Sequence, residues 1–164
     1  MGGSELTFYS HLKDFFSNPV LLAGVFSWLG AQLVKTAIQL FYGRISSLSE
    51  LIETMIWKTG GMPSSHSALV SSLCVSIAFN NGINSDIFIL SLAFFFVVIR
   101  DALGVRRSSG IQAKKINQLG NELKKNSIIK EYNPIKEVNG HSPVEVIFGC
   151  LLGFFVALAF FLLM

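Results

Sequence analysis

Four apolar segments dominate this chain and restrict it to architectures that are built inside a membrane. They run from Pro19 to about Gly43, from His66 to about Phe79, from Ile87 to about Val105 and from Pro143 to Met164. A membrane-crossing helix needs about 20 apolar residues, and the second segment is shorter and rich in Ser. Only 14% of the 164 residues are charged, whereas soluble domains carry about 25%. We therefore predict an all-α integral membrane bundle of about four transmembrane helices, forming one domain over residues 1–164.

The longest hydrophilic stretch, residues 106–142, is predicted to be a cytoplasmic or interfacial loop. Apolar residues recur in it with helical spacing, at Ile111, Ile116, Leu119 and Leu123. This pattern predicts an amphipathic helix from about Gly110 to Lys125, at the membrane surface or capping the bundle. A plain solvated loop is the alternative. A further short interfacial helix is predicted over Leu48–Trp57.

Basic residues are distributed unevenly between the two sides of the predicted bundle. If four segments cross, residues 44–65 and 106–142 share one side. They hold ten of the 13 basic residues: Arg44, Lys58, Arg106, Arg107, Lys114, Lys115, Lys124, Lys125, Lys130 and Lys136. The positive-inside rule then places both stretches in the cytoplasm. We expect a multi-pass protein of the bacterial plasma membrane, with its functional face towards the cytoplasm.

Polar residues inside the first apolar segment point to a polar site within the bundle. Gln32, Lys35, Gln39 and Tyr42 follow spacings of three, four and three, so they share one helix face. An ammonium group in hydrocarbon is costly and by default faces a partner or a polar cavity. Asp101 could hold either Lys35 or an arginine in place. The alternative is that Lys35 extends its ammonium to the membrane surface.

The fourth segment begins with a histidine and a carboxylate four residues apart, His141 and Glu145. Such a carboxylate can accept the imidazole N–H and fix its tautomer, which orients a nucleophile or a base. A histidine that merely lies at the membrane boundary is the alternative. Gly149 and Gly153 continue the stripe as a GxxxG pattern, which lets another helix approach closely. This stripe is also compatible with a homodimer.

The segment Gly60–Ser67, with the sequence GGMPSSHS, has the composition of an anion-binding turn. Its glycines permit an unusual turn, Pro63 fits the first position of a helix, and Ser64 and Ser65 can cap free N–H groups. A helix N-terminus after a flexible turn is a natural anion site. His66 stands where it could protonate a leaving oxygen. A plain loop that caps the second crossing is the alternative.

Arg106 and Arg107 supply the second phosphate-like element, because arginine binds phosphate oxygens through two parallel hydrogen bonds. A basic cluster that only ends a crossing is the alternative. Together with the two histidines, these cations suit attack on a phosphate, in which one histidine attacks and the other protonates the leaving group. Carboxylates are sparse and no histidine cluster has metal-ligand spacing, so no metal or other cofactor is expected.

These motifs resemble those of the superfamily of type 2 phosphatidic acid phosphatases and vanadium-dependent haloperoxidases. The likeness is closer to its divergent branch of small bacterial and plant membrane proteins. It rests on Gly60–Ala68, Asp101–Arg107 and Gly140–Val146, together with Lys35 and Gln39.

The resemblance implies a role for each motif. It makes His141 the nucleophile that forms a phosphohistidine, Glu145 its orienting carboxylate and His66 the acid for the leaving group. The residues implied to bind phosphate are Lys35, Arg44, Ser64, Ser65, Arg106 and Arg107, with Asp101 and Gln39 in support.

The sequence departs from the superfamily pattern in several places. Ile45 follows Arg44 where the superfamily has Pro, and Ser65 and Glu145 replace a glycine and an aspartate. Thirty-three residues lie between Arg107 and His141, where the superfamily has only a short spacer. The chain also has fewer crossings than the superfamily fold.

The function these observations favour is a membrane phosphatase that acts on a phosphomonoester or pyrophosphate of a lipid. Polyprenyl pyrophosphate, phosphatidic acid and phosphatidylglycerol phosphate are all compatible substrates. The predicted partners are the membrane and a lipid phosphate, with no nucleic acid. A protein that binds phosphate or anionic lipid without catalysis, or that serves as a complex subunit, is the alternative, and a small transporter is a further one.

Overall fold

The computed structural model describes residues 2–43, 47, 49, 52, 61–137 and 140–163. These residues form helices and connecting segments, with no strand among them, which confirms the all-α prediction. The elements are α1 (Gly2–Phe16), α2 (Pro19–Phe41), α4 (Ser65–Asn81), α5 (Asp86–Arg100), the π-helical turn η1 (Asp101–Val105), α6 (Arg106–Lys125) and α7 (Pro143–Leu163). The helix predicted over Leu48–Trp57 falls almost entirely outside the described residues.

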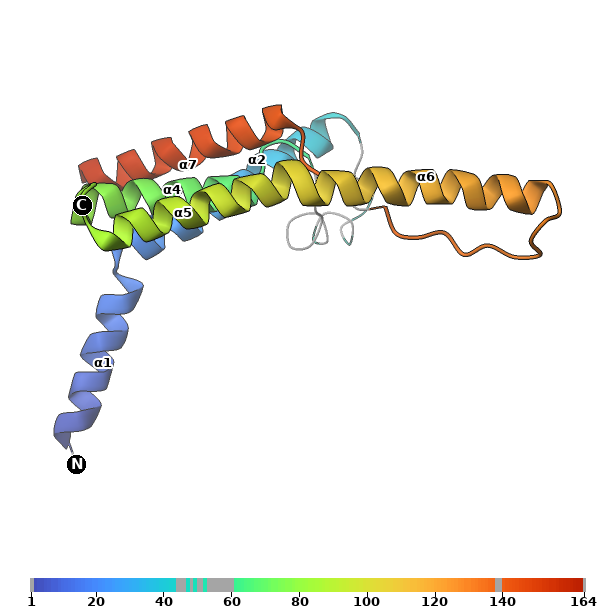
Figure 1. Ribbon diagram of the computed structural model, residues 1–164. Coiled ribbons are helices and arrows are strands. Elements are labelled where there is room, and N and C mark those ends of the chain that lie inside the picture. The colour runs from blue at the N-terminus through green and yellow to red at the C-terminus, as the bar shows by residue number, and fades with distance from the viewer. Residues whose placement is uncertain are drawn as a thin grey trace.

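Four helices, α2, α4, α5 and α7, lie side by side as an antiparallel bundle (Figure 1). Three helices are long and apolar enough to cross a membrane: α2, the continuous helix Asp86–Lys125 and α7. The 17-residue α4 is shorter and packs between α2, α5 and α7. The chain is therefore an integral membrane protein, and its bundle is compatible with the predicted number of about four crossings.

Small residues let α7 approach α4 very closely. A Cβ atom on Gly149 would collide with the carbonyl oxygen of Ser64, and one on Gly153 would collide with that of Ala68. The Ser71 hydroxyl also donates to the Cys150 carbonyl oxygen at 2.8 Å. The GxxxG prediction of close helix packing is confirmed, but the partner is α4 of the same chain. The glycine stripe is therefore covered and gives no support to a homodimer.

Helix α6 differs from the helix predicted for the long hydrophilic stretch. It begins at Arg106 instead of Gly110 and continues α5 through η1 without a break. Figure 1 shows it projecting beyond the bundle instead of capping it. Its 20 residues correspond to about 30 Å of helix. Gly104 lies inside this continuous helix and does not end it, and no proline follows it there.

The N-terminal helix α1, which the sequence reasoning did not predict, leaves the bundle at the end where the chain terminates (Figure 1). The Asn18 side chain caps α2 by accepting from the Val20 N–H at 2.9 Å, and Pro19 occupies the first position of that helix. One face of α1 carries five exposed apolar side chains, those of Phe8, Tyr9, Leu12, Phe15 and Phe16. Such a face is typical of helices that lie in the membrane interface.

Candidate active site

The two predicted catalytic histidines line one small cavity at the end of the bundle opposite the chain termini. His66 lies in the first turn of α4, and His141 lies just before α7. Asp101, Ala102, Arg106 and Val98 complete the lining of this cavity, whose volume is about 10 Å³. A cavity of that size holds about one water molecule. Histidines 75 positions apart in the sequence thus meet at one point, beside an arginine.

The side chain of His141 is held by the start of α7. Its ring is buried, with 5% of the residue exposed, and its Nδ1 lies 2.9 Å from Glu145 Oε2. The same carboxylate oxygen accepts the Ser142 N–H at 3.2 Å, and the Ser142 hydroxyl accepts the Glu145 N–H at 3.3 Å. This reciprocal pair is a capping box. An ionised carboxylate only accepts, so this contact suits the tautomer in which Nδ1 carries the proton and Nε2 has the lone pair.

The segment before α4 is fixed against the same helix. The Ser64 N–H donates to the Glu145 carbonyl oxygen at 3.0 Å, and the close contact at Gly149 brings the two helix starts together. Ser64 is the N-cap of α4, and its hydroxyl accepts from the Ser67 hydroxyl at 2.9 Å. Pro63 therefore precedes the cap and does not occupy the predicted first helical position, which is taken by Ser65.

Ser64 and Ser65 are both buried, and neither lines the small cavity. The Ser64 hydroxyl already takes part in capping, so its observed role is to shape the start of α4. His66 is the residue of this motif that faces the cavity.

The π-helical turn η1 positions the Arg106 side chain at the cavity that the two histidines line. In a π-helix the backbone bonds join residues five apart, and the Arg106 N–H donates to the Asp101 carbonyl oxygen. The side chains of these two residues also meet, with Arg106 Nε 2.6 Å from Asp101 Oδ2. Of the two partners considered for Asp101, the structure therefore selects an arginine over Lys35. The Nε bond leaves the terminal nitrogens of Arg106 available to a phosphate.

Arg107 has a different position from its neighbour. Its side chain is exposed and does not line the cavity, but its backbone lies directly against Gly140. A Cβ atom on Gly140 would collide with the backbone of Arg107 and would lie 2.7 Å from its Cβ atom. The absence of a side chain at Gly140 is thus what allows His141 to lie beside η1.

The chain between Arg107 and His141 forms an arm, in which α6 leaves the bundle and the described residues 126–137 run back along it (Figure 1). Asn117 on α6 holds the returning segment through four hydrogen bonds. Its Nδ2 donates to the Ile135 carbonyl and to Glu137 Oε1, both at 2.9 Å, and its Oδ1 accepts from Tyr132 Oη at 2.7 Å and the Ile135 N–H at 2.8 Å. The Tyr132 ring packs on Gly120. Arg107 and Gly140, at the two ends of the arm, are therefore in contact, as they would be if only a short spacer joined them.

Lys35 is buried inside α2, with 2% of the residue exposed. It does not line the small cavity. In the part of the chain that is described, its ammonium has no ion pair or hydrogen bond. Gly61 packs against the Lys35 chain and the Gln39 amide, at 3.6 and 3.7 Å from a Cβ position. Both predicted residues thus lie against the turn that precedes α4.

The predicted site residues fall into three groups. Those that meet at the cavity or hold its lining are His66, Asp101, Arg106, His141 and Glu145. Those that lie next to it are Lys35, Gln39, Ser64, Ser65 and Arg107. Arg44 lies outside the described residues. Among the described residues no three His, Cys, Asp or Glu side chains form a metal-binding group.

Three features of the site escaped the sequence reasoning. The capping box had a visible signature, the Ser142-Pro143-Val144-Glu145 sequence at the start of an apolar run. Gly140 and Asn117 had none, because close backbone contact and a polar hub between distant segments leave no local pattern.

An entirely apolar groove of about 330 Å³ lies beside the site. Its lining comes from α2, α7 and the turn before α4: Val34, Ile38, Met62, Pro63, Phe148, Leu151, Leu152 and Phe155. Val34 and Ile38 flank Lys35 along α2, and Pro63 directly precedes the cap of α4. The groove therefore runs along α2 beside the position of Lys35 and reaches the turn before α4.

Comparison with known proteins gives two findings. The profile of the family described as "Divergent PAP2 family" matches residues 16–156. A membrane protein from Bacillus subtilis (strain 168), "Uncharacterized membrane protein YuiD", is 36% identical over 155 residues, which cover 88% of this chain and 95% of that protein. No solved structure matches.

Proposed function

Because the chain belongs to the divergent PAP2 family, we propose that it is a metal-independent phosphatase whose nucleophile is His141. The observation that carries the proposal is the meeting of His66, His141 and an arginine held by Asp101 at one cavity. A tetrahedral phosphate needs these three functions: a nucleophile, an acid for the leaving group and a cation for the charged oxygens.

The proposed reaction has two steps. In the first, Nε2 of His141 attacks phosphorus, the bond from phosphorus to the leaving oxygen breaks, and protonated His66 gives that oxygen its proton. Glu145 stabilises the ring, because Nδ1 donates to its carboxylate. In the second, the now neutral His66 takes a proton from water, the water oxygen attacks phosphorus, and the phosphohistidine bond breaks to release phosphate.

The substrate proposed for this site is a phosphorylated lipid. The site lies at the end of a membrane-embedded bundle, and the apolar groove begins beside Lys35 and the start of α4. A lipid phosphate could place its head group at the histidines and its chain along α2 and α7. Polyprenyl pyrophosphate, phosphatidic acid and phosphatidylglycerol phosphate all have this form.

The direct test is phosphate release by the purified protein from a panel of lipid and soluble phosphates. We expect His141→Ala to abolish turnover, and His66→Ala to lower kcat by about 10²- to 10⁴-fold, the range for loss of a general acid. His11→Ala is the matched control, because His11 is exposed on α1 at the other end of the bundle. Activity that survives both site variants would disprove the proposed mechanism.

A second candidate function is binding of phosphate or an anionic lipid without turnover. It is favoured by the small volume of the cavity and by the ion pair that Arg106 forms with Asp101. Vanadate or phosphate that binds wild type and is lost in Arg106→Ala, with no hydrolysis of any compound in the panel, would select this function over the first.

A further inference from the structure

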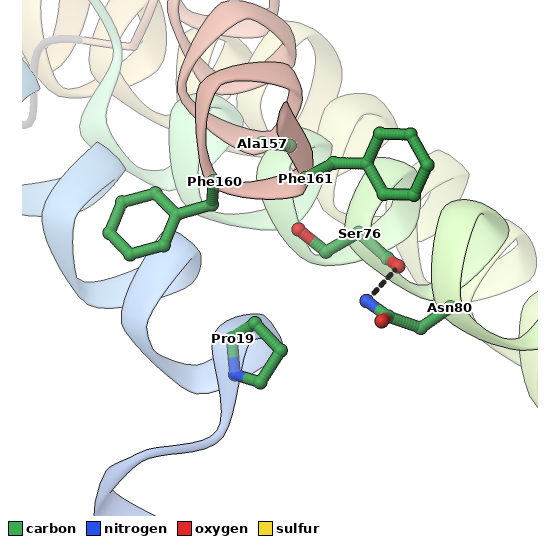
Figure 2. A pocket seen from close by; sticks show the side chains of 6 residues that line it. All are labelled: Pro19, Ser76, Asn80, Ala157, Phe160 and Phe161. Carbon is green, nitrogen blue, oxygen red and sulfur yellow. Dashed lines mark hydrogen bonds between the residues drawn. The ribbon is translucent and has the colours of Figure 1, made fainter. Parts of the chain in front are cut away.

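A second cavity lies at the end of the bundle opposite the candidate active site. Its volume is about 400 Å³, and residues from three helix ends line it: Pro19 of α2, Ser76 and Asn80 of α4, and Ala157, Phe160 and Phe161 of α7. Figure 2 shows these side chains surrounding the space between the three helices. Since α4 runs from Ser65 to Asn81, Ser76 is about 15 Å along this helix from His66.

Among the residues that line this cavity, Ser76 carries a buried hydroxyl that lacks a hydrogen-bond partner in the described part of the chain. The residue is 4% exposed, and its Oγ has no hydrogen-bond partner among the described residues. In Figure 2 this oxygen points towards Ala157 and the space that Phe160 and Pro19 border. A buried hydroxyl without a partner is costly, and it is more so where hydrocarbon surrounds the protein.

Asn80 supplies a second polar group at the mouth of the cavity. Its Nδ2 donates to the Ser76 carbonyl oxygen at 2.8 Å, which fixes the amide in place. The remaining lining is apolar and includes the Phe160 and Phe161 rings, and no charged side chain contributes to it. The ligand that fits such a cavity is uncharged where it meets Ser76 and Asn80 and apolar elsewhere.

The position of Ser76 along α4 narrows the chemistry of the ligand further. Five residues, or about 7.5 Å of helix, separate it from the end of α4. In a bilayer the polar head-group regions flank a hydrocarbon core of about 30 Å, and we infer from the position of Ser76 near the end of a membrane-embedded bundle that it faces the boundary between them. That boundary is where the ester and glycerol groups of a phospholipid lie.

We propose that this cavity binds the ester–glycerol region of a membrane phospholipid from the leaflet opposite the candidate active site. The Ser76 hydroxyl donates to an ester carbonyl oxygen, and the lipid chain packs on Phe160 and Phe161. The site is separate from the proposed phosphatase centre and does not depend on its activity.

Native mass spectrometry of purified protein titrated with dioleoyl phosphatidylglycerol tests the proposal, with the ether-linked analogue as a parallel ligand. We expect Ser76→Ala to weaken the tightest-bound ester lipid by about three- to tenfold, as for loss of one hydrogen bond. The ether lipid lacks the ester carbonyl and should bind wild type as weakly as the ester lipid binds Ser76→Ala. Ser76→Leu, which fills the cavity, should remove this lipid altogether.

Ser72→Ala is the matched control, since Ser72 Oγ is also buried without a partner on α4 but does not line the cavity. It should bind the ester lipid as wild type does. Equal affinity of wild type and Ser76→Ala, equal affinity for ester and ether lipids, or an equal loss in Ser72→Ala would each overturn the proposal. Retention of no lipid by wild type would also overturn it and would assign the hydroxyl to water.

Discussion

Gly140 is the position at which one added methyl group most directly tests how the site is assembled. Its α-carbon faces the backbone of Arg107, and a Cβ atom there would lie 2.7 Å from the Arg107 Cβ and closer to its backbone. Since carbon atoms pack at about 3.5 Å, and the Arg107 α-carbon is the nearest atom to this position, Gly140→Ala must separate the two segments by about 1 Å. Neither side is a flexible side-chain tip that could move aside.

This displacement acts directly on the proposed chemistry. His141 follows Gly140, and Arg106 precedes Arg107, so the shift separates the imidazole from the guanidinium that lines the same cavity. A misplacement of about 1 Å can cost about 10²-fold in rate. We therefore expect kcat/KM to fall by about 30- to 100-fold, which corresponds to about 2–2.7 kcal/mol. The bundle should keep its melting temperature, because Gly140 lies outside its helices.

The assay is phosphate release from the best lipid substrate, with thermal unfolding followed by circular dichroism. Gly104→Ala is the control, since Gly104 lies in the adjacent turn η1 and has nothing within 4 Å of its Cβ position. If Gly140→Ala keeps kcat/KM within about threefold of this control, the contact does not position His141 and the reasoning is refuted.

Three further changes test other parts of the molecule. Asp101→Asn should lower kcat/KM by about three- to tenfold in the same assay, because the Arg106 side chain loses its charged partner; unchanged kinetics would mean that Arg106 needs no such support. Asn117→Ala should speed limited proteolysis of residues 126–137 relative to the exposed control Asn121→Ala, since four hydrogen bonds hold that segment to α6. Gly153→Ala should destabilise the bundle by about 1–3 kcal/mol, because its Cβ would collide with the Ala68 carbonyl oxygen and lie 2.9 Å from the Ser72 nitrogen. Gly30→Ala, which has open space around it, should leave the melting temperature unchanged or raise it, because alanine favours a helix interior over glycine.

The apolar crossings were predictable because hydrophobic length alone defines them. The first segment, predicted over Pro19–Gly43, is observed over Pro19–Phe41, and the last matches to within one residue. The short Ser-rich segment is also a helix, at Ser65–Asn81. Its inner position explains its composition, because small serines allow close packing and Ser71 bonds to α7, so its hydropathy was an incomplete guide.

The parts that sequence reasoning missed depend on context beyond a few residues. The third crossing was predicted to end at about Val105 and a separate helix to begin at about Gly110, but the two form one continuous helix. Helix α1 had an apolar face in its sequence, which the polar composition of residues 1–18 concealed. The pairing of Asp101 with Arg106 depends on the π-helical turn, which alpha-helical spacing does not predict.

The position of His141 gives a physical reason for the glutamate that replaces the superfamily's aspartate. His141 lies before the helix, Ser142 caps it, and Glu145 is the third helical residue, so the carboxylate must reach back across a full turn. One oxygen then accepts from both the Ser142 N–H and the His141 ring. A capping box uses Glu or Gln at this position, and Asp is one methylene shorter. The longer side chain therefore joins two tasks, starting α7 and orienting His141, in a chain whose arm returns to the bundle just before the helix begins.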